Sequence, residues 1–277
     1  MGGLLALGTA AAGGGSALVY AYTVEPQKIE LVEQTIPLPG LAVGLSGLRA
    51  AQISDLHMGA WTSRELLERV VAAILAQKPD LVFITGDYLT TGGDLDRALA
   101  DLLAALSGLS QQVPVYTVMG NHDHQAGESE LRGLLADLGI QELANTIQPF
   151  RRGGDLLYIA GLDSVSTGHQ RLDILDREAP TDAPIILMAH EPDMADYSAA
   201  TGKFVLQISG HSHGGQVRLP LVGPLVLPWM GRKYPAGLYK IHGMQQYTNR
   251  GIGMIDVPLR LNCPPEITLF TFISSRW

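Results

Sequence analysis

Two histidines lie two positions apart in the segment Gly210-His211-Ser212-His213-Gly214-Gly215-Gln216. Glycines flank the pair on both sides, and glycine adopts backbone conformations that other residues rarely reach. A loop of this composition can turn both imidazole rings toward one centre. Imidazole is a common ligand of transition metals, so the segment suits metal binding.

Four other segments place metal-binding residue types directly after strand-like apolar runs. In open α/β sheets, functional groups gather at the carboxyl ends of strands, so segments that are distant in sequence are expected to converge there. The four are Asp55-Leu56-His57 after Leu48–Ile53, Gly86-Asp87 after Leu81–Ile84, Gly120-Asn121-His122-Asp123 after Val113–Val118, and His190 after Ile185–Ala189.

The donor atoms of this set are mixed. Mn, Fe and Zn accept oxygen and imidazole together, whereas Ca and Mg prefer shells of oxygen alone. Taken singly, the acidic residues could instead be helix N-caps, and His190 could be a structural histidine. As a set they indicate divalent transition metals. The oxygen donors are Asp55, Asp87 and Asn121, and the nitrogen donors are His57, His190, His211 and His213.

These five motifs occur in the order found in the calcineurin-like metallophosphoesterases, which this sequence resembles from residue 48 to residue 272. The pattern is Asp-x-His, Gly-Asp, Gly-Asn-His-Asp or Glu, His, and Gly-His-x-His, and ordered motifs are more specific together than singly. The bacterial membrane-linked phosphodiesterase branch is the most similar. Its later segments resemble Gly-His-Ser-His-Gly-Gly-Gln, Asn249-Arg250-Gly251-Ile252-Gly253 and Pro264-Pro265-Glu266-Ile267.

The resemblance implies a hydrolase of phosphodiesters or phosphomonoesters that depends on two divalent transition-metal ions, Mn, Fe or Zn. A hydroxide that bridges the two ions would attack phosphorus, because bound metals lower the pKa of water. One ion would be held by Asp55, His57 and His213, the other by Asn121, His190 and His211, and Asp87 would bridge them.

Three further residues are candidates for catalysis or substrate binding. By the same resemblance, His122 would donate a proton to the leaving oxygen or stabilise the charge that develops there, and Asp123 would orient the His122 ring. Arg250 follows a predicted strand and could contact a substrate phosphate through its planar guanidinium. An internal ion pair explains Arg250 equally well.

The first half of the sequence predicts a parallel sheet layer, because strand-like and helical patterns alternate. Thr62 and Glu65 form a capping-box pattern that opens the first of its helices. The strands are expected at Leu48–Ile53, Leu81–Ile84 and Val113–Val118, and the helices from Thr62 to Gln77, at Leu95–Leu106 and at Glu128–Leu138.

From about Ile140 onward, short strands prevail. The resemblance implies that they complete an α/β fold, the two-sheet α/β/β/α metallophosphoesterase sandwich. They are expected at Thr146–Phe150, Leu156–Ala160, Ile185–Ala189, Phe204–Ile208, Gln216–Leu219, Gly237–His242, Gln245–Thr248 and Ile267–Ile273.

Three segments are expected along the 277 residues. Residues 1–24 would be an apolar membrane anchor or the remnant of an export signal, since Gly2–Val24 has no charge and a span needs roughly 20 residues. A disordered Gly/Ala tail is the alternative. Residues 25–47 would hold a leading strand, Ile29–Leu38, and a linker, and residues 48–277 the calcineurin-like phosphoesterase domain.

The expected location is a membrane, with the catalytic domain outside the cytoplasm. Glu25–Glu33 contains three Glu and one Lys, and cytoplasmic flanks are usually basic. A cytoplasmic face remains the alternative.

The net charge of −8 and the absence of a basic stripe disfavour nucleic-acid binding. A single cysteine, Cys263, excludes an intramolecular disulfide and is expected to be a small buried residue.

The apolar, proline-rich segment Leu219–Gly237 has two interpretations. It could be a structural loop over the core, or a substrate lid or membrane-dipping loop with Trp229 and Met230 at the interface and Arg232 or Lys233 facing phosphate. Outside the motifs, Asp163 is interpreted as a turn residue. His124, His169 and His242 are expected at the surface.

Two other functions stay open. The substrate could be lipid-linked, as for a UDP-2,3-diacylglucosamine pyrophosphatase-like hydrolase of lipid A synthesis. The fold could also serve as a noncatalytic metal-binding scaffold, although such a protein would be expected to lose ligands or the His122 equivalent. The sequence does not indicate an oligomeric state.

Overall fold

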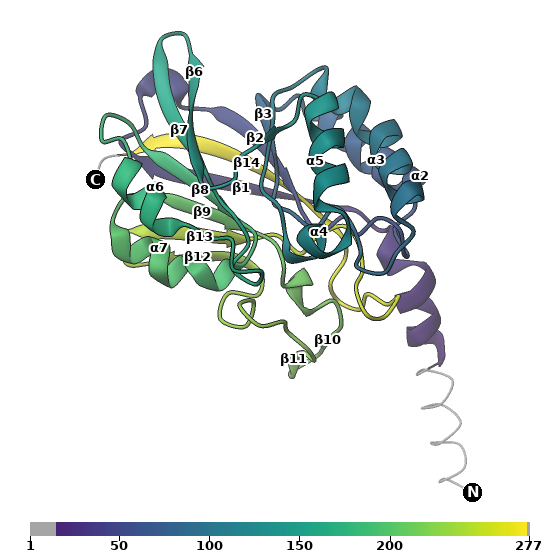
Figure 1. The fold of residues 1–277 in the computed structure, drawn as a ribbon. Coiled ribbons are helices and arrows are strands. Elements are labelled where there is room, and N and C mark those ends of the chain that lie inside the picture. The colour runs from purple at the N-terminus through teal and green to yellow at the C-terminus, as the bar shows by residue number, and fades with distance from the viewer. Residues whose placement is uncertain (1–14, 276–277) are drawn as a thin grey trace, which may run out of the picture.

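Two six-stranded sheets stack face to face in the computed structural model, which describes residues 15–275 (Figure 1). In spatial order, the first sheet contains β1 (Glu30–Pro39), β14 (Glu266–Ser275), β2 (Leu48–Ile53), β3 (Leu81–Ile84), β4 (Val115–Thr117) and β5 (Gln141–Glu142). The second contains β12 (Gly237–Ile241), β13 (Met244–Thr248), β9 (Leu206–Ser209), β8 (Ile185–Ala189), β7 (Asp155–Leu162) and β6 (Thr146–Arg152).

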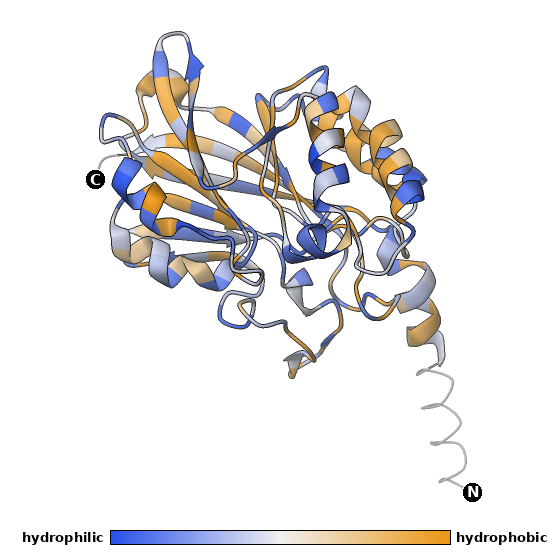
Figure 2. Cartoon of the chain, viewed as in Figure 1, coloured by the Kyte–Doolittle hydropathy of each residue, from blue (hydrophilic) through white to orange (hydrophobic). Residues whose placement is uncertain are grey.

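Helices cover the outer face of each sheet, which confirms the α/β/β/α sandwich (Figure 1). The first sheet is covered by α2 (Arg64–Ala76), α3 (Leu95–Ser110) and α5 (Glu128–Asp137), and the second by α6 (Leu172–Glu178) and α7 (Ala195–Thr201). Figure 2 shows hydrophobic residues along the strands and on parts of these helices. The strands β3 and β8 are apolar and buried throughout, as expected for parallel strands that are covered on both faces.

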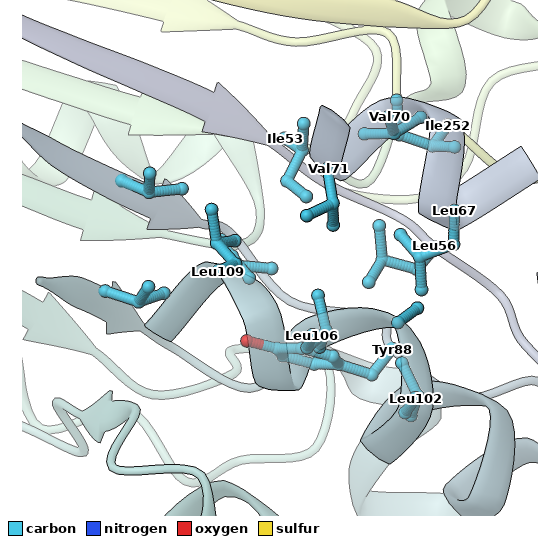
Figure 3. Packing of buried hydrophobic residues seen from close by; sticks show 14 of the residues in the cluster. Ile53, Leu56, Leu67, Val70, Val71, Tyr88, Leu102, Leu106, Leu109 and Ile252 are labelled. Atoms are coloured by element: carbon cyan, nitrogen blue, oxygen red, sulfur yellow. The ribbon is translucent and has the colours of Figure 1, made fainter. Parts of the chain in front are cut away.

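The helix-side core continues beneath the loops that follow β2 and β3. Figure 3 shows Leu56, Tyr88 and Ile252 packed with side chains of α2 and α3. The Tyr88 hydroxyl also donates to Thr117 Oγ1 at 2.8 Å. Because Leu56 lies between Asp55 and His57, and Tyr88 follows Asp87, burial of these two apolar side chains holds the neighbouring polar residues in place.

The element boundaries agree closely with expectation for the longer elements. Leu81–Ile84 and Ile185–Ala189 are strands as predicted. The first helix begins one residue later than its predicted cap, because Ser63 rather than Thr62 is the N-cap and its Oγ accepts the Leu66 amide hydrogen. Three short helices were not predicted, namely α4 (Asn121–Ala126), α6 and α7.

The segment 25–47 contributes a strand to the first sheet. Its β1 pairs in parallel with β14 along ten residues, from Glu30 opposite Glu266 to Pro39 opposite Ser275. The leading strand is therefore an edge of the sandwich, packed against the C-terminal strand.

The predicted anchor or export-signal segment, residues 1–24, lies partly outside the described residues, which begin at residue 15. Residues 15–23 are helical, and the Ala21 carbonyl accepts the Arg260 amide hydrogen at 3.0 Å. In the described range, none of the helices combines the length and the apolar character needed to cross a bilayer.

Candidate metal centre

Loops at the carboxyl ends of five strands carry the candidate ligands. Within each sheet these strands run parallel to one another, so their loops meet at one edge. The loop after β2 carries Asp55 and His57, the loop after β3 carries Asp87, α4 begins at Asn121 after β4, the loop after β8 carries His190, and the loop after β9 carries His211 and His213.

The ligand loops share an unusual backbone. Five candidate ligands have a left-handed conformation, which costs residues with a Cβ about 1–3 kcal/mol each. Hydrogen bonds between loops stabilise this backbone conformation. The Asp55 amide donates to the Gly86 carbonyl, and the His57 amide donates to the Asp87 carbonyl. The φ angles are 52° at Asp55, 48° at His57, 55° at Asp87, 68° at His211 and 51° at His213.

One group consists of Asp55, His57 and His213, whose buried donor atoms lie within 4.8 Å of one another. His213 Nε2 lies 3.3 Å from Asp55 Oδ1 and 3.1 Å from His57 Nε2. Burial lowers the pKa of His57 to about 3 and holds the pKa of His213 well below its ordinary value. Both rings are therefore neutral near pH 7, the form that binds a metal ion.

The second group consists of Asp87, His190 and His211. His190 Nε2 lies 3.1 Å from Asp87 Oδ2 and 3.2 Å from His211 Nδ1. The other ring nitrogens have partners outside the group: His190 Nδ1 is 2.7 Å from the Thr85 carbonyl, and His211 Nε2 is 2.8 Å from the Trp229 carbonyl. These carbonyls accept ring N–H groups and so determine which nitrogen faces the centre.

Asp87 belongs to the second group and also lies beside the first. Its Oδ1 accepts the His122 amide hydrogen at 2.9 Å. Its Oδ2 lies 3.1 Å from His190 Nε2 and 3.6 Å from His57 Nε2, one histidine from each group. Gly120 makes room for this carboxylate, because a Cβ there would lie 2.1 Å from Asp87 Oδ1. Asp87 thus stands where a bridging ligand is required.

Asn121 supplies a further oxygen beside Asp87, and both residues line one cavity. Asn121 Oδ1 is buried, and it has no hydrogen-bond partner among residues 15–275. An unsatisfied buried polar atom costs about 1–3 kcal/mol, which a cation would offset. With the two groups and Asp87 between them, this oxygen fits a pair of divalent cations.

Asp87 and His190 form an ion pair. Burial raises the pKa of Asp87, but the charge of His190 and their hydrogen bond outweigh it and hold that pKa well below its ordinary range. Burial lowers the pKa of His190, but Asp87 raises it well above its ordinary value. The His190 ring is therefore protonated at neutral pH, and a metal ion bound to it would have to displace that proton.

His122 also faces the cavity, and its ring lies 4.9 Å from that of His57. The Thr91 amide hydrogen points at His122 Nδ1 from 3.4 Å, and Thr91 Oγ1 lies 2.8 Å from the same nitrogen. Nδ1 is therefore an acceptor, and the proton of a neutral ring lies on Nε2. The sequence offered no signal for Thr91.

Asp123, which was expected to orient the His122 ring, contacts backbone amides. Its carboxylate accepts the backbone amide hydrogens of Asp87, Leu89 and Gly120 at 2.9–3.0 Å. In the described part of the chain, no hydrogen bond joins it to the His122 ring. Asp123 instead ties the loop after β3 to the start of α4.

Arg250 forms the internal ion pair that was the alternative to a phosphate contact. Its guanidinium pairs with Glu266 and, at 2.9 Å, with Glu30, and Arg250 is not among the residues that line the cavity. The internal ion pair is thus the correct interpretation. The segment around Arg250 supports the first group, because the Gly253 amide donates to the Asp55 carbonyl at 2.7 Å.

Three other expectations are corrected by the structure. His124 is not at the surface: its side chain is 2% exposed, and its Nε2 lies 2.7 Å from Asp163 Oδ1. Asp163 is therefore a partner of His124 and more than a turn residue. Lys233 does not face the centre, because its ammonium pairs with Asp196 at 2.6 Å.

Comparison with known proteins identifies the family. The family described as calcineurin-like phosphoesterase matches residues 48–215. The chain belongs to this family. It is 35% identical to the metallophosphoesterase YkuE of Bacillus subtilis, over 99% of this chain and 95% of that protein. It is 29% identical to the phosphodiesterase YaeI of Escherichia coli, over 92% of both chains.

The calcineurin-like phosphoesterases use two divalent metal ions, and this chain is a metal-dependent phosphoester hydrolase. A Danio rerio protein named as transmembrane with a metallophosphoesterase domain is 32% identical over 90% of this chain and 59% of its own length. Two solved structures share the fold at 14% identity. The Thermus thermophilus protein TT1561 has a TM-score of 0.51, covering 75% of this chain and 91% of its own, and a Danio rerio dimetal phosphatase has a TM-score of 0.50, covering 75% and 88%.

Proposed function

We propose that Asp55, His57 and His213 hold one metal ion, that Asn121, His190 and His211 hold the other, and that Asp87 bridges them. The observation that carries this assignment is the position of Asp87 Oδ2 between one histidine of each group. The mixed donors favour Mn, Fe or Zn. When bound, such a pair lowers the pKa of water and neutralises charge on a phosphoryl group.

His122 acts on the leaving group in this proposal. Its Nε2 carries the proton, because Nδ1 accepts the Thr91 amide hydrogen. That proton would pass to the alkoxide released from a phosphodiester or phosphomonoester. The other four histidines are buried beneath the loops. His122 lines the cavity and is half-buried, so a leaving group in the cavity could reach its ring.

Turnover by metal-stripped protein tests both assignments. An aryl phosphomonoester and the matching diester would be assayed with Mn, Zn or Mg restored. We expect His122→Ala to lower kcat about 10²–10⁴-fold while two ions remain bound, and Asp87→Asn to lose both turnover and bound metal. His242→Ala, a change at an exposed histidine, is the control. Two bound ions without any turnover would favour the noncatalytic scaffold.

Membrane association is the second part of the proposal. The helix at residues 15–23 exposes large apolar side chains, with Leu18 61%, Val19 63% and Tyr22 58% exposed. Exposed apolar side chains that adjoin one another mark an interaction surface. The relative named as transmembrane supports the same location. The segment Glu25–Glu33 has one basic residue, Lys28, whereas cytoplasmic flanks are usually rich in Lys and Arg, so we place the catalytic domain outside the cytoplasm.

Cell fractionation of the full-length protein tests this location. We expect the wild type in the membrane fraction and a Leu18→Lys, Tyr22→Lys double variant to shift toward the soluble fraction. Tyr197→Lys is the matched control, because Tyr197 is 62% exposed on α7, away from the N-terminal helix. A wild-type protein that is wholly soluble would contradict the proposal, and protease protection in intact cells would indicate the cytoplasmic face.

A further inference from the structure

A cavity of about 500 Å³ opens beside the metal centre. One wall contains candidate ligands and His122, so a molecule in the cavity would reach the reacting centre directly. The volume is in the range of pockets that bind small molecules. Such pockets are mostly apolar, with a few polar groups that orient the ligand.

Two loops contribute apolar side chains to the cavity wall. The loop 216–228 and the loop 255–259 together contribute Val217, Leu225, Val226, Ile255, Val257 and Leu259. Three of these remain well exposed, with Leu225 53%, Val226 73% and Val257 44%. Exposed apolar side chains are unfavourable in water. An apolar ligand that covered these side chains would remove them from water.

Hydrogen bonds join the two loops into one wall. Gln216 Nε2 donates to the carbonyls of Ile255 and Val257 at 3.1 and 2.8 Å. The Ile255 amide donates back to Gln216 Oε1 at 2.9 Å. The two loop backbones are therefore joined before a ligand binds, which lowers the cost of ordering the loops.

Among the described residues that line this cavity there is no lysine or arginine. The charged residues of the lining are the ligand Asp87 and the exposed Asp256, both acidic. A substrate with a second phosphate or a polyanionic part would meet no cation here apart from the metal ions. The wall instead suits an uncharged, apolar substituent.

We infer that the substrate is a phosphoester with an aliphatic chain, and that this chain occupies the apolar wall while the phosphate lies at the metal ions. This inference rests on the proposed two-metal hydrolysis and adds the substrate class. Each methylene that moves from water to an apolar site adds a similar amount of binding free energy. Substrate affinity should therefore increase with chain length until the chain covers the apolar wall.

The test is a series of p-nitrophenyl alkyl phosphodiesters from methyl to octyl, assayed below their micelle concentrations with metal-loaded full-length protein. We expect kcat/KM to rise by up to about fourfold per methylene and then to level off. The ratio of octyl to methyl kcat/KM is the readout. It should fall at least tenfold in a Leu225→Gln, Val257→Thr variant.

Leu221→Gln is the matched control. Leu221 lies between β10 (Arg218–Leu219) and β11 (Gly223–Pro224), is fully exposed and does not line the cavity, so its variant should keep the wild-type ratio. Equal turnover of methyl and octyl esters by the wild type, or an equal fall in the control, would overturn the inference alone. No turnover of any ester would overturn the proposed hydrolysis and the inference with it.

Discussion

The loop after β3 positions His122 as well as carrying Asp87. The Thr91 amide donates to His122 Nδ1, and Thr91 Oγ1 lies 2.8 Å from the same nitrogen and 3.3 Å from Gln125 Oε1. This contact holds the ring in the tautomer with the proton on Nε2, the nitrogen that would serve the leaving group. Thr91 is therefore a positioning residue, since it acts through His122.

Substitution of Thr91 tests the positioning. Thr91→Val removes the hydroxyl but keeps the side-chain shape, and we expect kcat to fall about tenfold with little change in KM. Thr91→Ser restores the hydroxyl and should recover most of the rate. A steady-state comparison with bound metal measured in parallel would check this. Equal rates in all three proteins would contradict a role for the hydroxyl.

The Asp87–His190 ion pair would couple metal binding at the proposed centre to pH. The raised pKa of His190 means that the metal-free protein holds its proton at pH 7, and the bound ion requires the neutral ring. Metal affinity should therefore increase with pH, by about tenfold per pH unit for each proton released. Calorimetric titration in two buffers of different ionisation enthalpy measures that release. If no protons were released when the metal bound, the result would contradict an ion pair between Asp87 and a protonated His190.

At the scale of elements, a buried arginine supports the loop that holds Asp55. Arg260 is fully buried, and its guanidinium donates to the carbonyls of Gly251, Gly253 and Cys263 at 2.6–3.2 Å. The same loop meets the Asp55 segment through the Gly253 amide. Removal of the guanidinium would leave several buried carbonyls without donors.

We expect Arg260→Met to lower the free energy of unfolding by about 3 kcal/mol. Denaturant unfolding of the metal-free protein measures this. Arg177→Met is the control, because Arg177 lies at the surface beside Glu178 and should change stability by less than about 0.5 kcal/mol. An equal effect in the two variants would contradict the supporting role of Arg260.

The contacts of α4 with the residue after β7 and with the start of α5 depend on charge. Burial lowers the pKa of His124, but its interactions with Asp163 and Glu128 outweigh burial and raise that pKa to about 9. Since the folded-state pKa exceeds the unfolded value, the protonated ring stabilises the fold fully below about pH 6.5, and the contribution disappears as the pH rises through 9.

His124→Gln should therefore destabilise the protein more at pH 6 than at pH 10. Chemical denaturation of both proteins at the two pH values gives the difference. A loss of stability that does not vary with pH would show that His124 acts through packing alone, including its stacking on the His169 ring at 4.3 Å.

Across the whole molecule, the convergence of the ligand candidates was predictable because each follows a buried apolar strand, and parallel strands end at one edge. The partners of Asp123, Arg250 and Thr91 were not predictable, since they depend on contacts between loops that are distant in sequence. The helices α4, α6 and α7 were missed for another reason. Each spans two turns or fewer, too short to show a helical period.

The central claim is that seven side chains from both halves of the sandwich hold two metal ions. Crystals of the wild type would be measured for anomalous scattering at the Mn, Fe and Zn edges. We predict two peaks on either side of Asp87, one beside Asp55, His57 and His213 and the other beside Asn121, His190 and His211. A single peak, or peaks away from these residues in catalytically active protein, would contradict the claim.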